Sequence, residues 1–363
     1  MLKQSLSQKH NRVNFSTYAG VIVVYVLMLL LKNGGHISNS LAGQLVPICC
    51  YMSMAVSLNL TVGILGELSL GHAGFMSVGA FSGVIAAMSL QSAIPSAGLR
   101  LAIGMVVGMI FAGLAGLLIG TPVLRLQGDY LAIVTLAFGE IIKDLINCLL
   151  VGHDSNGLHM AFNLDGSMTI DDLGMAEGGV AIIKGAQGAT GTSTIATFTA
   201  GFILVMVTLV IVLNLKHSRA GRAIMALRDN RIAAESVGVN VTKYKMLAFS
   251  ISAALAGAAG ALYGLNYSSL VASKFNFNTS ILILVFVVLG GLGNVTGSLI
   301  AAAALTILPE LLRQFADYRM LAYAVILILV MLITNNPQIK GFFTGLTAKL
   351  KRGRQGEEAQ DNE

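Results

Sequence analysis

Three polar side chains, Glu67, Ser69 and His72, stand in the glycine-rich segment 63–74, between two long apolar runs. Ionisable groups at membrane depth are costly and usually face a cavity or a partner, and four glycines within this segment disfavour a regular helix. One interpretation is a broken or re-entrant segment that lines a passage. The alternative, equally open, is a connector at the membrane surface whose Glu and His face water. A lone His with a lone Glu offers too few ligands for a metal site.

A second polar group consists of Glu140, Lys143 and Asp144, whose spacing of three and four places them on one helix face. Such a face could belong to a translocation path. The interpretation that we favour is a helix end that emerges into external water, because Asn147 and a polar loop follow. Glu140 nevertheless stays with Glu67, Ser69 and His72 as a candidate for the path.

The connector 216–245 carries a third pattern, with basic residues interleaved with small and apolar ones. Apolar contacts are available from Leu227 and Ala234, and charge from Arg222 and Arg228. This pattern predicts short helices that lie along the cytoplasmic surface, one of them ended by Gly238. The alternative is an ordinary basic loop that is attracted to anionic lipid.

The elements that must position these residues are membrane helices. Of the 363 residues, 55% are hydrophobic and 11% charged, whereas soluble domains carry about 25% charged residues. Apolar runs long enough to cross a bilayer recur along the chain. They cover 13–31, 33–66, 68–99, 101–124, 130–150, 185–215, 246–273, 275–309 and 320–339. Because glycines interrupt the long run at 290–293, we divide it in two. The prediction is an all-α polytopic membrane protein with about ten helices, of which those at 63–74 and 290–293 can be broken or re-entrant.

Connector charges predict the orientation. The N-terminus 1–12, the connector 216–245 and the tail 336–363 are basic or begin basic, whereas 151–194 is acidic. The positive-inside rule therefore places both termini and 216–245 in the cytoplasm, and 151–194 outside as a loop of the transmembrane domain 13–335. The composition of that loop favours flexibility. The first apolar run resembles a signal peptide but lacks a convincing cleavage site, so we expect a retained helix.

Other classes of function find little support in the sequence. The formal net charge of +6 lies mostly in short connectors, so topology explains it and we expect no nucleic-acid partner. Neither a P-loop nor a GxSxG or HExxH motif is present, and the cysteines have no metal-site spacing. Glycine pairs four residues apart, as at 79/83, 104/108 and 260/264, predict close helix packing within the chain. We therefore expect that the chain is not an enzyme.

Several stretches resemble one family. They are ELSLGHAGF at 67–75, LRLQGDYLAIVTLAFGE at 124–140, the segment 221–264 with RIAAESVGV at 231–239, VVLGGLGN at 287–294 and LPELLR at 308–313. Their order and content resemble the permease subunits of branched-chain amino acid ABC importers, in particular the M-type subunits of Liv systems. The chain departs from the family at Gln127, where Arg is frequent.

The resemblance implies a permease in a bacterial cytoplasmic membrane. The partners would be a second related permease, two cytoplasmic ATP-binding subunits and an extracytoplasmic substrate-binding protein. ATP and Mg would bind to the ATPases, and this chain would hold no cofactor. The segment 221–238 would couple to the ATPases through Gly221, Arg222, Ala226, Arg228, Ala234, Glu235 and Gly238. Alternative cargoes are urea, short amides and other amino acids. Alternative classes are a secondary transporter that couples ions through Glu67 or Glu140, and a membrane-embedded enzyme.

Overall fold

The chain is mainly helical in the computed structural model, which describes residues 2–35, 38–126, 128–164, 167–176 and 178–312, together with 321, 324, 325 and 328. The helices are α1 Leu2–Asn33, α2 Asn39–Asn59, the π-helix η1 Leu60–Leu65, α3 His72–Ser89, α4 Ala97–Val123, α5 Asp129–Asn147, α6 Phe198–His217, α7 Arg219–Asp229, α8 Arg231–Ser236, α9 Val241–Gly264, α10 Phe277–Gly290 and α11 Val295–Leu311. Single turns of 3₁₀-helix form η2 Asp171–Leu173, η3 Gly185–Gln187 and η4 Ala272–Phe275.

Six helices within the described residues are long and apolar enough to cross a membrane. They are α1 from Ser16, α2 with η1, α3, α4, α6 and α9. The helices α10 and α11 are apolar but shorter, and α5 carries several charges. A polytopic helical fold is thus confirmed, whereas the number ten stays a prediction. The predicted run 320–339 lies largely outside the described residues.

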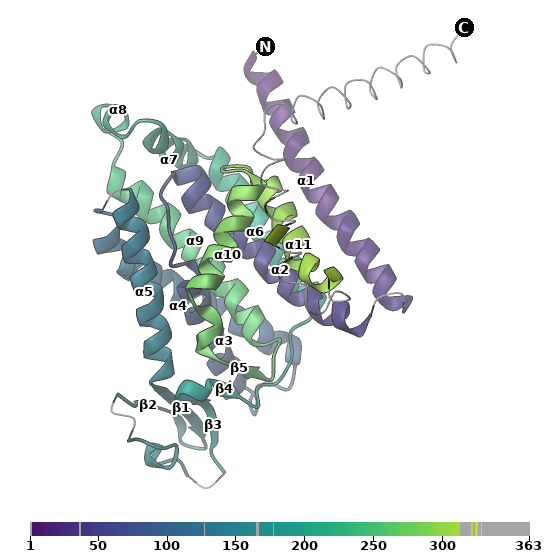
Figure 1. Cartoon of the computed structure of the whole chain (residues 1–363), viewed down its shortest axis with the longest axis vertical. Coiled ribbons are helices and arrows are strands. Elements are labelled where there is room, and N and C mark those ends of the chain that lie inside the picture. Colours follow the sequence, from purple (N-terminus) through teal and green to yellow (C-terminus); the bar gives the residue numbers. More distant parts are fainter. Residues whose placement is uncertain are drawn as a thin grey trace. The chain divides into compact units, whose positions relative to one another are not determined.

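Successive helices of the bundle run in opposite directions between two ends. At one end, α7 and α8 lie next to the end of η1, the end of α6 and the start of α9. At the other, the end of α3 and the loop before α6 meet a small β-sheet, since Ser89 O accepts a hydrogen bond from His153. Figure 1 shows α7 and α8 at the top and the sheet at the bottom. We call these the α7–α8 end and the sheet end.

The sheet corrects the all-α prediction and the expectation of a flexible connector. Its strands β1 Leu149–Asp154, β2 Gly157–Phe162, β3 Val180–Lys184, β4 Ala189–Thr190 and β5 Ser269–Leu270 pair antiparallel in the order β2-β1-β3-β4-β5. Asp154 Oδ1 closes the β1–β2 turn by accepting hydrogen bonds from the N–H groups of Asn156, at 2.7 Å, and Gly157, at 3.0 Å. An Asp that binds the backbone two residues on is a turn signal. The Gly and Thr residues of the connector favour a flexible loop, so its composition did not predict these strands.

Backbone-to-backbone packing joins α3, α4 and α9, and it confirms the prediction from the glycine pairs. A Cβ atom on Gly79 would lie 2.1 Å from Gly257 O, and one on Gly83 would lie 2.9 Å from Gly104 O. Side chains are thus excluded where the three helices cross. In lipid, such close approach gives the van der Waals contact that holds helices together.

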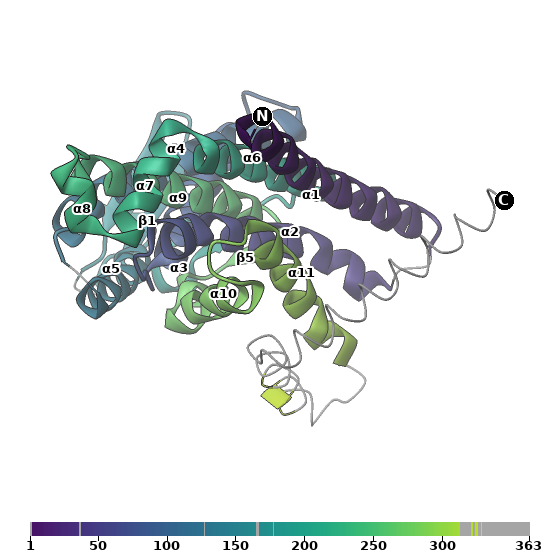
Figure 2. The ribbon, with the colours of Figure 1, turned by 90° about the horizontal axis from the view of Figure 1, so that it is seen from above.

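The helix α1 lies at the rim of the bundle beside α6 (Figure 2). Tyr25 stacks on Phe202, with ring centroids 4.0 Å apart, and its hydroxyl is 3.1 Å from Thr199 Oγ1. The outward face of α1 is apolar, with Val23 and Leu30 more than half exposed. This surface is suited to contact with lipid.

Candidate functional site

The segment 63–74 interrupts the bundle without leaving it. The π-helix η1 ends at Leu65, the next residue Gly66 has a φ of +81°, and α3 begins only at His72. Glu67 pairs with Lys245 at the start of α9, and their side chains are 14% and 5% exposed. A surface connector whose Glu and His face water is therefore the wrong interpretation. The structure has a broken helix whose polar groups are buried.

The other polar groups of this break are deeply buried. His72 Nε2 lies 2.8 Å from Ser57 Oγ, and Ser69 Oγ has no hydrogen-bond partner within the described residues. The start of α3 is held from two sides, because Thr135 Oγ1 of α5 accepts from Leu70 N and Ser280 Oγ of α10 accepts from Ala73 N. Free N–H groups at a helix start need such acceptors when they are buried.

Glu140 belongs to another part of the bundle. Its carboxylate pairs with Lys143 and accepts a hydrogen bond of 3.0 Å from Phe277 N, the first residue of α10. A carboxylate at a helix N-terminus is favourable. Because α10 begins just after β5 and η4, this contact lies toward the sheet end, whereas the Glu67–Lys245 pair lies toward the α7–α8 end. The four path candidates are therefore not one cluster.

The connector 216–245 folds as the pair of short helices predicted from its sequence. Ser218 Oγ caps α7 by accepting from Gly221 N at 3.0 Å, and Asn230 Oδ1 caps α8 by accepting from Ala233 N at 3.0 Å. Side chains of this type are preferred at helix starts. Just beyond α8, Gly238 turns the chain with a φ of +84°, a conformation that favours glycine.

The seven predicted coupling positions divide by burial. Five of them are exposed: Arg222, Ala226, Arg228, Glu235 and Gly238. Gly221 and Ala234 are buried inside this chain, and a Cβ on Gly221 would lie 2.0 Å from Leu215 O. These two small residues therefore permit close packing within this chain, Gly221 against the end of α6. The resemblance instead implies that both residues couple to the ATPases.

Two apolar side chains that the sequence analysis did not place on the surface stand out on this segment. Ile232 is 79% exposed and Val237 is 78% exposed, on and just after α8. A small buried cluster of Leu227, Ala234 and Val241 lies behind them and packs α7 and α8 against the start of α9. Periodicity over the six residues of α8 cannot decide which of its faces is covered, so the sequence does not predict this exposure.

Three further polar residues went unnoticed as site residues. Asn59 lies fully buried in an apolar run, and its amide contacts Gly293 N and Ser298 Oγ. Lys216 and Lys245 counted only as connector charge, yet Lys216 Nζ donates to Gly293 O and Lys245 pairs with Glu67. The usable signal was a polar residue, Asn59, placed one turn before a glycine break.

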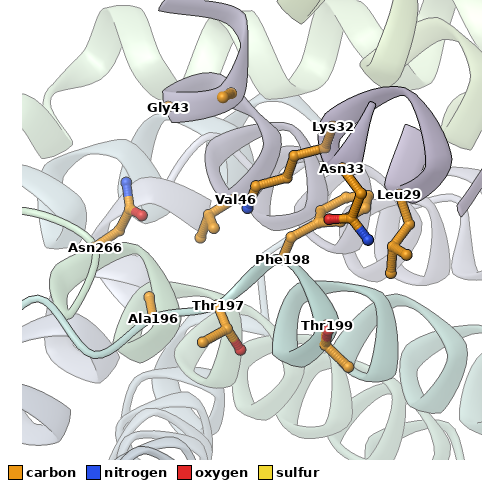
Figure 3. Close-up of a pocket in the computed structure, with 11 residues that line it drawn as sticks. Leu29, Lys32, Asn33, Gly43, Val46, Ala196, Thr197, Phe198, Thr199 and Asn266 are labelled. Atoms are coloured by element: carbon orange, nitrogen blue, oxygen red, sulfur yellow. The ribbon is translucent and has the colours of Figure 1, made fainter. Parts of the chain in front are cut away.

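A cavity of about 380 Å³ lies between α1, α2 and α6 (Figure 3). Lys32, Asn33, Thr197 and Thr199 line it together with apolar residues, of which Phe198 is one. It contains none of the predicted site residues. Its single charged side chain, at the end of an exposed helix, is typical of a lysine that reaches toward the membrane surface.

Comparison with known proteins decides what this bundle is. The family model described as the branched-chain amino acid transport system permease component matches residues 40–334. The chain belongs to this family. It is 34% identical over 320 residues to the high-affinity branched-chain amino acid transport permease LivM of Salmonella typhimurium, which covers 85% of this chain and 72% of that protein. LivM of Escherichia coli K12 matches equally, and LivH of Salmonella typhimurium is 23% identical over 290 residues, or 78% of this chain and 89% of LivH.

Membership confirms the family that the sequence resembles and the permease function of an amino acid ABC importer. The matched range contains the break at 63–74, Glu140 and the α7–α8 segment. A membrane permease also explains why Glu67 pairs with Lys245 and Asn59 with Ser298, since hydrocarbon offers such groups no water.

Proposed function

We propose that this chain is one of two permeases in an ATP-driven importer that moves branched-chain amino acids across a bacterial cytoplasmic membrane. The single observation that carries the proposal is the match over residues 40–334 to permease components of branched-chain amino acid transport. The similarity to both LivM and LivH supports a pair of related but different permeases.

The α7–α8 segment is the dock for the ATPase partners in this proposal. Its exposed side combines Ile232 and Val237 with the charges of Arg222 and Glu235. Exposed apolar side chains rimmed by charge are typical of protein interfaces. ATP and Mg bind to those partners, which hydrolyse the nucleotide, and this chain needs no cofactor of its own.

Orientation follows from charge. The α7–α8 end carries the basic connector 216–245, so the positive-inside rule places it in the cytoplasm together with both termini. The sheet end then faces outward, where a substrate-binding protein delivers the amino acid. Alternation of the described helices between the two ends supports this assignment, because the connector after α4, which carries Arg125, then falls on the cytoplasmic side and the acidic segment 151–194 falls outside.

Two other functions remain as outcomes of experiment. Urea, a short amide or another amino acid can replace the branched-chain cargo, since the binding protein would set specificity. A secondary transporter would need ionisable groups open to ions, whereas Glu67 is buried against Lys245 and Glu140 pairs with Lys143. These contacts favour the ATP-driven importer.

The test is uptake of labelled leucine by proteoliposomes that contain this chain, its second permease and both ATPase subunits, with the binding protein added outside. We expect uptake that needs ATP inside. The double variant Ile232→Asp, Val237→Asp should abolish ATPase capture on purification, while Val180→Asp, at an exposed valine of strand β3, should leave capture intact. Ion-driven accumulation by this chain alone would refute the importer.

A further inference from the structure

The two glycine breaks of the chain touch each other at the α7–α8 end. Gly63 lies in η1, and Gly293 lies in the turn between α10 and α11. A Cβ on Gly63 would lie 2.2 Å from Gly293 N and 1.8 Å from Asn59 Oδ1. Asn59 ties the two breaks by accepting from Gly293 N at 2.9 Å and donating to Ser298 Oγ at 2.8 Å. We call this meeting point, formed by Gly63, Gly66 and Gly293, the glycine junction.

Two helix C-termini converge at the junction. The π-helix η1 ends at Leu65 and α10 ends at Gly290, and the last carbonyls of a helix lack partners within it. Their partial negative charge attracts cations. Arg228 Nη1 donates to one such carbonyl, Gly63 O in the last turn of η1, at 3.0 Å. Lys216 Nζ donates at 2.8 Å to Gly293 O, which lies in the turn just after α10.

Arg228 reaches the junction from α7 across Gly66. A Cβ on Gly66 would lie 2.5 Å from Arg228 Cγ, so the aliphatic stem lies against this glycine. The guanidinium is also fixed from the other side, because Nε and Nη2 donate to Asp229 Oδ1 at 3.1 and 2.9 Å. Arg222, by contrast, donates to the nearby His217 O. Among the side-chain hydrogen bonds that α7 makes in the described part of the chain, the bond from Arg228 to Gly63 O is the one that reaches a residue outside the segment 216–245.

We propose that Arg228 is a positioning residue that transmits the movement of α7 to the glycine junction, and thereby to both broken helices at once. This inference rests on the proposed function, in which ATPases displace α7. It separates Arg228 from its predicted role as a contact with the ATPase. Ile224 and Leu227 hold α7 to the bundle by apolar contacts, which do not depend on a particular orientation of the groups. The charge-assisted hydrogen bond from Arg228 to Gly63 O, by contrast, requires one geometry.

The decisive measurement compares Arg228→Gln with wild type in proteoliposomes that hold both permeases, the ATPases and the binding protein. Leucine uptake and phosphate release are measured on one preparation, with ATPase capture as a third readout. Glutamine is too short to span Gly66, so we expect unchanged capture and ATP hydrolysis with uptake per ATP reduced about tenfold or more. Arg228→Lys keeps one donor and should recover part of the uptake. The matched control is Arg219→Gln, an exposed arginine of the same helix.

A second variant reaches the same contact from its other side. Gly66→Ala should displace the Arg228 stem and uncouple transport in the same way, and the double variant should be no worse than either single one. Gly128→Ala is the control, since Gly128 also has a positive φ, +59°, but open space around it. If Arg228→Gln does not insert, Gly66→Ala and Arg228→Lys decide.

The outcomes separate the two proposals. Loss of ATPase capture in Arg228→Gln would make Arg228 a docking residue and overturn this inference, while it would leave the importer standing. Unchanged uptake per ATP would also overturn it. A wild-type complex that takes up leucine without ATP would refute the proposed function, and the transmission role with it.

Discussion

The buried ion pair between Glu67 and Lys245 yields a quantitative prediction about stability. It joins the break after η1 to the first turns of α9, with side chains only 14% and 5% exposed. Removal of one partner from such a pair costs about 3–5 kcal/mol, because the remaining charge stays buried without a counter-charge. We expect about 3 kcal/mol or more for Glu67→Gln, which leaves Lys245 stranded. Lys245→Met should cost less, because Glu67 keeps more contact with solvent.

The assay is unfolding of the purified chain in mixed micelles by titration with SDS, followed by circular dichroism. A loss of about 3 kcal/mol shifts the folded-to-unfolded ratio more than a hundredfold, well beyond error. The double variant Glu67→Gln, Lys245→Met should lie within about 1 kcal/mol of wild type, because no charge is left stranded. Additive losses in the double variant would refute the reasoning, since they would show that the two side chains do not interact.

Two further predictions concern packing and pH. Gly79→Ala places a methyl group 2.1 Å from Gly257 O and should destabilise the chain by about 1–3 kcal/mol in the same titration, while Gly98→Ala, which meets open space, should be neutral. The pKa of Asp154 is lowered from 3.8 to about 2, chiefly by the hydrogen bond that Ala176 N donates, then by Asn156 N and His159. A depressed folded pKa means that this stabilisation is complete above pH 3.8 and is lost as the pH falls to about 2. Amide exchange in the sheet should accelerate over that range and lose this dependence in Asp154→Asn.

The sequence predicted the helices well because apolar run length and connector charge are local properties. Each predicted run within the described residues contains a helix, and the division at 290–293 coincides with the turn between α10 and α11. The pairing of β1 with β3 and of β4 with β5 was missed because it joins residues far apart in the sequence, such as Ala189 and Leu270. The turn at Asp154 gave a weak signal inside a polar, glycine-rich stretch.

The candidate site was predicted as a set of residue types but not as a set of contacts. Basic residues of 216–245 were treated alike, since sequence shows charge and not direction. In the structure, Lys216, Arg228 and Lys245 turn inward to carbonyls or to Glu67, whereas Arg222 stays at the surface. The glycine breaks were noted as a pair, but nothing local in sequence shows that they touch.

The stiffness of the bundle differs between its parts, and this difference bears on how a permease could move. The helices α3, α4 and α9 meet backbone to backbone, as Gly79 and Gly257 do, so they cannot slide without a clash. At the glycine junction, long side chains with several rotatable bonds hold the two broken helices, and Gly66 and Gly293 adopt positive φ values. Displacement applied at α7 should therefore deform the junction and leave the three-helix unit intact. Cysteine cross-links across α3 and α9 should then survive transport, whereas cross-links between η1 and α7 should block it.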